Sequence, residues 1–544
     1  MDTRTAAIGL GLAIGLMTPP LAHSGESSGW SVRGDTTSRI EYYDISGDRR
    51  LGSYAEDGLQ AYQELNLGIR HDTGDGQRWD LDLSGVFSGS EYRTLDDGAH
   101  LEYVRLSYEG ADGPAPYRLD LGDQRARFSR LSLDQDLRGV RLETQPRLGQ
   151  TNHSLVWISG AYRRHWYGDD ETLAPSLVAP EGDFHGASWL VADPVFGDIS
   201  LNLAHHDQTA FTGAEDTHLV TSLALSREFQ LLHQHLDAEA EWARLEGEQW
   251  SGVHQDPEQS VQDRGWHAQV SGRDDMLPLP VDYAVRYERY GEDFEPVGTK
   301  VVGDSRTLGA SAGLSLNERV RLQGRYNRYV DQAAGLNPVR VDEHGMELAM
   351  PFAVGPVLSR QTLDVSHRER ADRQGGIDQL TRRASWDMRL PLAATHEAQV
   401  ELFWLDLDDR AADTLDRRER RLGLAHESRF RVGELDVTAA PGVAYRSRDG
   451  HLEQHTLSPT LSLAAAGALH ELGVALGYRR LDRPGLVAPD AEEYHLAMDW
   501  RYRRDRHVLG VEYEHQLAEA RSGEELDLWR AGLFWRYDFS RDSL

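Results

Sequence analysis

Histidines and carboxylates occur close together in this sequence, and such groups can bind metals or exchange protons. His205 and His206 are followed by Asp207, and imidazole and carboxylate groups are common metal ligands. Consecutive residues of a strand point to opposite faces, so His205 and His206 cannot both bind one ion from a regular strand. Asp80 and Asp82 do share a face, ~6.6 Å apart along a strand. For such pairs we expect a hydrated wall, balanced by nearby arginines, rather than a catalytic dyad.

Other catalytic patterns are missing from the sequence. Cysteine is absent from all 544 residues, which excludes disulfides, thiolate metal sites, cysteine nucleophiles and covalent c-type haem. No spacing selects a serine, histidine and aspartate as a triad. We find no glycine-rich phosphate loop and no basic, aromatic-interleaved patch for nucleic acid. The sequence therefore predicts a protein that is not an enzyme and has no metal, no cofactor and no nucleic-acid partner.

The segment 526–539 indicates which element positions the charged residues. Its odd positions carry Trp529, Leu533 and Trp535, whereas its even positions carry Arg530 and Arg536. Side chains alternate between the two faces of a strand, so one face is aromatic and the other is charged. The apolar face ends in aromatic residues, as is typical of a membrane–water boundary. We predict a lipid-facing aromatic belt that comprises Trp500, Tyr502, Tyr513, Trp529, Trp535, Tyr537 and Phe539.

The same alternation recurs along the chain, and one face repeatedly carries charges of both signs. A packed core could not accept these charges without pairing each one, whereas a water-filled lumen can. The net charge of −31 and mean hydropathy of −0.57 agree with a barrel in which only every second residue is apolar. The predicted lumen-lining residues are Asp80, Asp82, Arg286, Arg321, Arg325, Arg501, Arg503, Glu512, Glu514, Arg530 and Arg536.

The connections between the alternating segments are short and long in turn. This asymmetry is typical of outer-membrane barrels, which have short periplasmic turns and long extracellular loops. We predict an all-β fold, a single closed antiparallel transmembrane barrel of about 22–26 strands. The weakest strand signals lie at 218–227, 358–367 and 456–463. Among the predicted long connections are 124–136, 247–264 and 291–304.

The first 24 residues have the pattern of a secretory signal. Arg4 supplies a positive charge, an apolar stretch follows, and small residues at Ala22 and Ser24 predict cleavage before Gly25. We therefore divide the chain into a signal peptide, 1–24, and a barrel, 25–544.

From its alternation and its aromatic last strand, the segment 25–544 resembles the large outer-membrane β-barrels of Gram-negative bacteria. The resemblance implies an outer-membrane location and contact with lipid and lipopolysaccharide. The first predicted strand, 30–43, begins soon after the signal, so we expect a barrel without a plug domain. The plan is also similar to the barrels that sheathe multihaem cytochromes, which implies a partner protein that fills the lumen or docks from the periplasm.

Two classes of function follow. The first is a channel or conduit with a wide aqueous lumen, which passes solutes, exports a polymer or protein, or houses an electron-transfer partner. The second is a structural barrel that displays acidic surface loops. Within the first class, the connection 124–136 carries Arg125, Arg127 and Arg130, which would form a positive constriction if the connection folds inward. The alternative is a solvated external loop.

Overall fold

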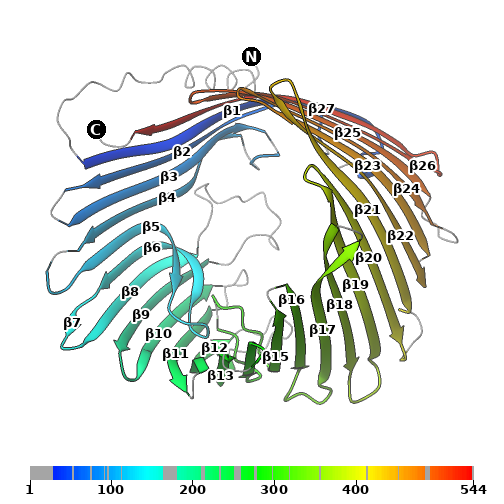
Figure 1. The fold of residues 1–544 in the computed structure, drawn as a ribbon. Helices are drawn as coiled ribbons and strands as arrows, with labels where there is room; N and C mark the ends of the chain where they lie inside the picture. The colour runs from blue at the N-terminus through cyan, green and yellow to red at the C-terminus, as the bar shows by residue number, and fades with distance from the viewer. Residues whose placement is uncertain are drawn as a thin grey trace.

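Strands follow one another along almost the whole chain in the computed structural model (Figure 1). The structure describes residues 29–541 apart from internal gaps at 52–53, 55, 74–75, 91, 95–96, 112, 163–180, 210–214, 232–233, 250–258, 275–277, 297, 318, 355–356, 412–414, 451–452 and 484–489. The predicted signal peptide lies outside the described residues. One short 3-10 helix, η1 (Arg49–Leu51), follows the first strand. No helix among the described residues is both long and apolar enough to span a membrane.

The strands of the first half of the chain are β1 (Gly29–Gly47), β2 (Gly58–Asp72), β3 (Gln77–Gly89), β4 (Gly98–Gly110), β5 (Tyr117–Arg127), β6 (Asp134–Thr144), β7 (Arg147–Leu148), β8 (Thr151–Tyr162), β9 (Glu181–Asp193), β10 (Gly197–Thr209), β11 (Glu215–Leu231), β12 (Gln234–Gln249), β13 (Gln259–Asp274) and β14 (Val281–Tyr290). Those of the second half are β15 (Ser305–Asn317), β16 (Val320–Asp331), β17 (Val339–Val354), β18 (Val357–Ala371), β19 (Asp378–Ala393), β20 (His396–Asp409), β21 (Arg417–Val432), β22 (Leu435–Gly450), β23 (Gln454–Ala466), β24 (His470–Asp482), β25 (Ala491–Arg504), β26 (His507–Ala520) and β27 (Glu525–Arg541).

The sheet closes on itself, because β1 pairs antiparallel with both β2 and β27. β7 is a two-residue strand in the turn before β8, so 26 strands make up the wall. The predicted closed antiparallel barrel of about 22–26 strands is therefore confirmed. The three segments with weak signals are strands as predicted, namely β11, β18 and β23.

Some predicted loops were too long. The connection predicted at 247–264 is strand up to Gln249 and again from Gln259. The connection predicted at 124–136 is a hairpin, in which only 128–133 lies between β5 and β6. Both stretches are polar, and their charged residues suggested loops. Strands can extend past the membrane and remain paired there, where polar side chains meet water.

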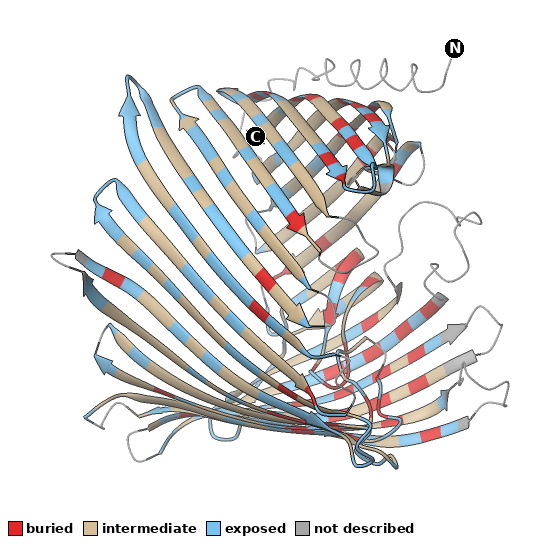
Figure 2. Cartoon of the chain, turned by 90° about the vertical axis from the view of Figure 1, so that its right-hand side faces the viewer, coloured by how far each residue is buried: buried red, intermediate tan, exposed pale blue. Residues whose placement is uncertain are grey.

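Turn lengths differ at the two ends of the barrel. Short turns lie at 194–196, 433–434 and 505–506, and longer connections lie at 291–304 and 332–338 on the other side. β1 begins and β27 ends on the side of the short turns, since Gly29 pairs with Asp72 and Arg541 pairs with Val32. Figure 2 shows the strands tilted across the wall, as closure of a barrel requires.

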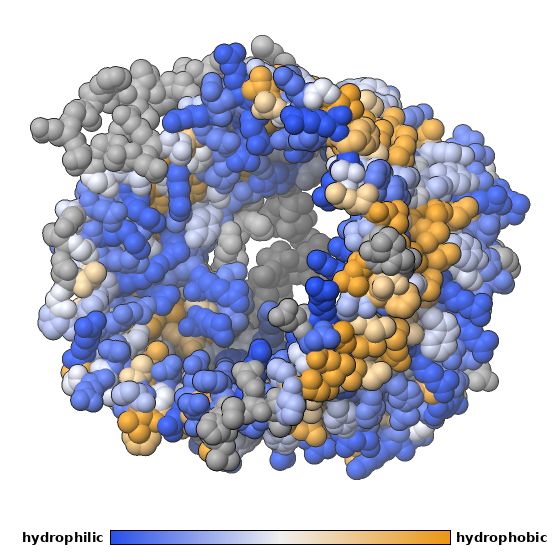
Figure 3. Space-filling model, in the orientation of Figure 1, coloured by the Kyte–Doolittle hydropathy of each residue, from blue (hydrophilic) through white to orange (hydrophobic). Residues whose placement is uncertain are grey.

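Large apolar side chains point outward from the wall. Trp189, Leu201 and Leu223 are nearly half exposed although they lie in the middle of their strands, which suits contact with lipid rather than water. In the space-filling view of Figure 3, hydrophobic residues gather over the right-hand wall, and an opening remains near the centre. The outward face is therefore apolar over a wide area, and the charged residues described below lie on the inward face.

Candidate functional site

The β5–β6 hairpin leaves the wall and bends into the interior (Figure 1). β5 pairs with β4 only from Tyr117 to Gly122, and beyond this point it pairs only with β6. Gly122 has a φ of 98°, which a residue with a side chain would adopt only with strain. Next to it, Asp123 accepts a 2.9 Å hydrogen bond from the backbone N–H of Val104. A carboxylate thus takes the place of the missing strand partner at the point of departure.

The tip of this hairpin, the inward segment Phe128–Leu133, packs against the inner wall. Leu131 and Leu133 are almost completely buried in a cluster that includes Leu245. The ring of Phe128 lies over Gly186 of β9, in the space that a Cβ atom would occupy. Figure 2 shows buried residues gathered in this part of the ring. Apolar burial therefore holds the inward segment against the wall.

A second connection covers the same wall. In the loop 291–304, Phe294 is fully buried and lies over Gly265 of β13, stacked on Tyr290 at 6.0 Å. The two elements are joined, because the backbone N–H of Asp134 donates to the carbonyl of Gly298 at 2.8 Å. The loop and the inward segment together form one layer inside the barrel.

Carboxylates crowd the outer side of the loop 291–304. Burial raises the pKa of the Asp293 carboxyl above its usual value, and repulsion from Asp263, Asp304 and Glu295 raises it further. The backbone N–H of Asp293 donates to Asp263 at 2.8 Å. The charged form of Asp293 therefore works against the folded loop.

A buried carboxylate anchors the tip of the hairpin. Glu241 of β12 accepts hydrogen bonds from the hydroxyl of Ser129 at 2.6 Å and from the backbone N–H of Leu131 at 3.2 Å. Ser129 also lies 3.1 Å from the hydroxyl of Ser222, which accepts from Asn202 at 3.0 Å. The inward segment is therefore fixed by polar groups of three neighbouring strands as well as by apolar contacts.

The three arginines predicted to form a constriction lie on this hairpin. Arg125 is exposed on the side turned away from the wall and pairs with Asp134 of the same hairpin at 2.6 Å. Arg130 reaches Glu288 of β14 at 2.5 Å, and Arg127 is exposed. Two of the three charges are thus partly neutralised, which reduces the positive belt expected from the sequence. Their effect on selectivity stays a prediction.

The sequence did not single out the groups that seat the hairpin, namely Glu241, Gly186, Gly265 and Phe294. Isolated glycines in the strand pattern of β9 and β13, and single phenylalanines in otherwise polar connections, were the available signals. Neither signal identifies its partner, since the pairs are far apart in the sequence.

The predicted lumen-lining residues all lie on strand faces opposite to the exposed hydrophobic residues. Asp80 and Asp82 alternate with the exposed Trp79, and Arg286 lies between the exposed Val285 and Tyr287. The remainder follow the same rule on β16, β25, β26 and β27; these are Arg321, Arg325, Arg501, Arg503, Glu512, Glu514, Arg530 and Arg536.

Opposite charges pair on this inward face. Arg325 bonds Asp364 at 2.8 Å, and Arg530 reaches Glu514 at 3.4 Å. These pairs explain how a wall with many charged residues stays folded. Their side chains are between one sixth and two fifths exposed, so the pairs lie at the edge of solvent.

The predicted aromatic residues lie on the outward face but do not form a single belt. Trp535 and Tyr537 neighbour His507 at the short-turn end, with Trp535 donating to its ring at 3.2 Å. Trp529 lies near the other end of β27 and contacts Tyr42 at 5.2 Å. Trp500, Tyr502 and Phe539 belong with the short-turn group, and Tyr513 lies between the two. Aromatic side chains thus mark both ends of the apolar band, as in other barrels.

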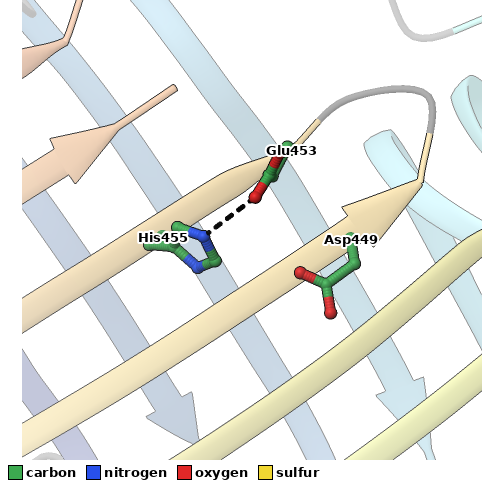
Figure 4. Close-up of side chains that lie close together, drawn as sticks. All are labelled: Asp449, Glu453 and His455. Carbon is green, nitrogen blue, oxygen red and sulfur yellow. Dashed lines mark ion pairs between the residues drawn. The ribbon is translucent and has the colours of Figure 1, made fainter. Parts of the chain in front are cut away.

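Metal ligands are brought together at one place among the described residues. Asp449, Glu453 and His455 lie at the β22–β23 hairpin, with ligand atoms within 4.8 Å of one another (Figure 4). His455 and Glu453 form an ion pair of 3.4 Å, and Asp449 accepts from Ser447 at 3.3 Å. These partners account for the cluster without an ion, and Glu453 is exposed.

His205 and His206 do lie on opposite faces, since only His206 is buried against the inner layer.

Comparison with known proteins gives matches among solved structures alone. A scan of protein-family models gives no match, and neither does a search of curated proteins. Among solved structures, the chain is similar to the outer membrane transporter YddB from Escherichia coli, at 9% identity and a TM-score of 0.41, covering 93% of this chain and 81% of that one. The fold is a closed antiparallel β-barrel of 26 strands, as the strand pairing shows.

Two further solved structures match at similarly low identity. The ferric enterobactin receptor PfeA from Pseudomonas aeruginosa matches at 10% identity and a TM-score of 0.43, over 93% of this chain and 80% of that one. The P pilus usher PapC translocation pore matches at 10% identity and a TM-score of 0.32, over 94% of this chain and 99% of that one. These proteins differ in what they carry, and none of them supplies a cargo for this chain.

Proposed function

We propose that this chain is an outer-membrane channel whose aqueous lumen is narrowed by its own β5–β6 hairpin. The observation that carries the proposal is the inward segment Phe128–Leu133, which is buried against the inner wall and bonded to Glu241. An element seated inside a charged, water-filled barrel reduces the cross-section open to solutes. Hydrophilic solutes would pass beside it, along a wall that carries both signs of charge.

The rest of the inner wall supports passage rather than tight binding of one ion. Charges of both signs face inward and are partly exposed. Filters that select one ion use close rings of a single charge or of backbone carbonyls. A mixed wall favours weak selectivity among hydrated solutes.

Conductance of the purified protein in planar lipid bilayers tests the proposal. Replacing 128–133 by a two-residue turn should increase the single-channel conductance, because the inward segment is removed. Replacing 372–377, a connection of equal length between β18 and β19, by the same turn is the control and should leave conductance close to that of the wild type. A wild-type barrel that forms no channel, or equal conductance in both variants, would contradict the proposal. A barrel closed by a partner protein or a purely structural barrel would give the first of these results.

A further inference from the structure

β18–β22 lie across the interior from the hairpin (Figure 1). Several arginines lie on the inward faces of β18, β19, β21 and β22. Their inward direction follows from strand alternation, because Trp386, Leu402 and Leu422 on the same strands point outward. We call this set the arginine patch; it comprises Arg368, Arg370, Arg383, Arg417, Arg421, Arg446 and Arg448.

The patch places like charges side by side. Arg421 of β21 lies directly opposite Arg446 of β22 in the antiparallel register. Residues directly opposite have Cβ atoms about 5 Å apart, and like charges there destabilise the sheet. The buried Glu419 lies between them, with ion pairs to Arg446, Arg421 and Arg417. One carboxylate therefore serves three guanidinium groups.

An aromatic side chain holds two of these arginines in place. The guanidinium of Arg421 lies 4.7 Å from the ring centre of Phe403, and that of Arg383 lies 5.3 Å from it. Phe403 is on β20, between the strands of the two arginines. Arg421 is also paired with Glu419, whereas the ring fixes Arg383 without neutralising it, so the N–H groups of Arg383 stay available to an anion.

Few carboxylates lie directly opposite the arginines of the patch. In the part of the chain that the structure describes, neither Arg383 nor Arg448 forms an ion pair. Arg448 lies opposite Glu419, whose oxygens are already bonded to other arginines. Among the described carboxylates, only Glu343 and Glu419 lie directly opposite a patch arginine, namely Arg368 and Arg448. The other inward carboxylates of β17–β20 lie further along their strands; these are Glu347, Asp364, Asp387, Glu397, Glu401 and Asp409.

We propose that the arginine patch binds solutes that carry several oxyanion groups, such as linked carboxylates, as they pass along the lumen. A guanidinium group forms paired hydrogen bonds with carboxylate or phosphate, and a row of them suits an elongated anion. Such a solute would relieve the repulsion between Arg421 and Arg446. The proposal rests on the proposed channel function, since it names the class of solute for that lumen.

Two measurements on the full-length barrel test the patch, one by binding and one by conductance. Trigalacturonate should bind to the detergent-solubilised protein in calorimetry and should reduce ion current in a bilayer, whereas the neutral maltotriose should do neither. The double variant Arg383→Gln with Arg448→Gln should weaken both effects about tenfold, because two charge-assisted contacts are lost. Both effects should weaken as salt rises.

A matched pair of arginines on the outer face serves as the control. Arg382 and Arg418 lie beside patch residues in sequence but point outward, where both approach Asp406. Arg382→Gln with Arg418→Gln should bind trigalacturonate as the wild type does. Heat-modifiable migration on gels checks that each variant is folded, and the wild type is compared with both at equal protein concentration.

The outcomes separate the two proposals. If the wild type conducts but trigalacturonate and tripolyphosphate neither bind nor block, the arginine patch is not an anion site although the channel stands. If trigalacturonate binds in a charge-dependent way but no channel forms, the patch stands and the channel function fails. If the inner double variant (Arg383→Gln with Arg448→Gln) and the outer one (Arg382→Gln with Arg418→Gln) weaken trigalacturonate binding equally, the arginine patch is not the binding site. Comparing trigalacturonate with tripolyphosphate then distinguishes carboxylates from phosphates as the bound group.

Discussion

The hydroxyl of Ser129 donates a 2.6 Å hydrogen bond to the carboxylate of Glu241, across 112 residues of sequence. Both oxygens of this carboxylate also lie within 3.3 Å of the backbone N–H of Leu131. One side chain of the wall thus bonds the tip of the hairpin that we propose narrows the lumen. Whatever weakens this contact should widen the pathway without opening the barrel itself.

Glu241→Ala should therefore raise single-channel conductance or add large current fluctuations. Loss of hydrogen bonds to a buried charged acceptor costs about 1.5–3 kcal/mol each, enough to release a short segment. Glu239→Ala is the control, because Glu239 lies on the same face of β12 and its carboxylate pairs at 4.0 Å with His267 of β13, not with the hairpin. If both variants conduct alike, Glu241 does not hold the hairpin.

An engineered disulfide can test the inward position directly, because the natural chain has no cysteine. The hydroxyl oxygens of Ser129 and Ser222 are 3.1 Å apart. Ser129→Cys with Ser222→Cys should oxidise readily, shown by mass spectrometry with and without reductant, and should suppress the fluctuations of Glu241→Ala. Ser129→Cys with Ser315→Cys, where Ser315 lies at the short-turn end of β15, should not oxidise. Free thiols in the first pair would mean that the hairpin lies elsewhere.

Gly186→Val should displace the ring of Phe128, because the new side chain would occupy the space where the ring lies. Overpacking of this kind costs about 1–3 kcal/mol, and we expect higher conductance together with lower thermal stability of the inward segment. Gly309→Ala, where the nearest atom would be 3.7 Å from the new Cβ, should change neither. The measurement is the protection of the backbone amides of 128–133 from hydrogen exchange. Unchanged protection in Gly186→Val would show that the ring of Phe128 does not pack on Gly186.

The two faces of β27 should respond differently to charge. Leu533 is half exposed on the outward face, so Leu533→Arg should destabilise the barrel by about 2–4 kcal/mol if it lies near the bilayer midplane. Arg536→Leu on the inward face should cost much less. Spin labels at the two positions should differ in their access to lipid-soluble and water-soluble quenchers, and equal access would show that the register is wrong.

The loop 291–304 should become less stable as pH rises. The pKa of Asp293 is raised by burial and by neighbouring carboxylates, so the folded loop favours the protonated acid. This contribution is complete below the unfolded pKa of about 3.9 and is lost as pH rises through the folded value. Proteolysis of the loop should be slower at pH 4 than at pH 7 when a protease active at both is used. In Asp293→Asn the rates of proteolysis at pH 4 and pH 7 should become similar, whereas Glu292→Gln should keep the difference between them.

The period of two residues explains why the wall was predictable. Each strand repeats the same choice between lipid and water, so Trp529 and Arg530 could be assigned to faces from the sequence. Phe534 broke the pattern, and the structure shows that its ring lies inward over Gly510, beneath the guanidinium of Arg39 at 5.2 Å. An aromatic ring that covers a glycine on the neighbouring strand is a local exception that only the register reveals.

The interior layer was not predictable in the same way. Arg125, Arg127 and Arg130 identified the hairpin, but its direction depends on Gly186, Gly265 and Glu241, which lie far away in the sequence. Nothing periodic links these positions. The arginine patch was also missed, because its members belong to four strands and meet only when the register is known.

The departure of β5 from β4 also marks a level in the membrane. From Gly98 to Val104, β4 is not paired with β5, and the carboxylate of Asp123 accepts a hydrogen bond from the N–H of Val104. Hydrocarbon does not tolerate an unpaired strand edge, because its backbone groups would lack hydrogen bonds. The acyl chains must therefore end at or below this stretch, which sets the upper limit of the bilayer core on the barrel and leaves the hairpin's point of departure at the depth of the lipid headgroups.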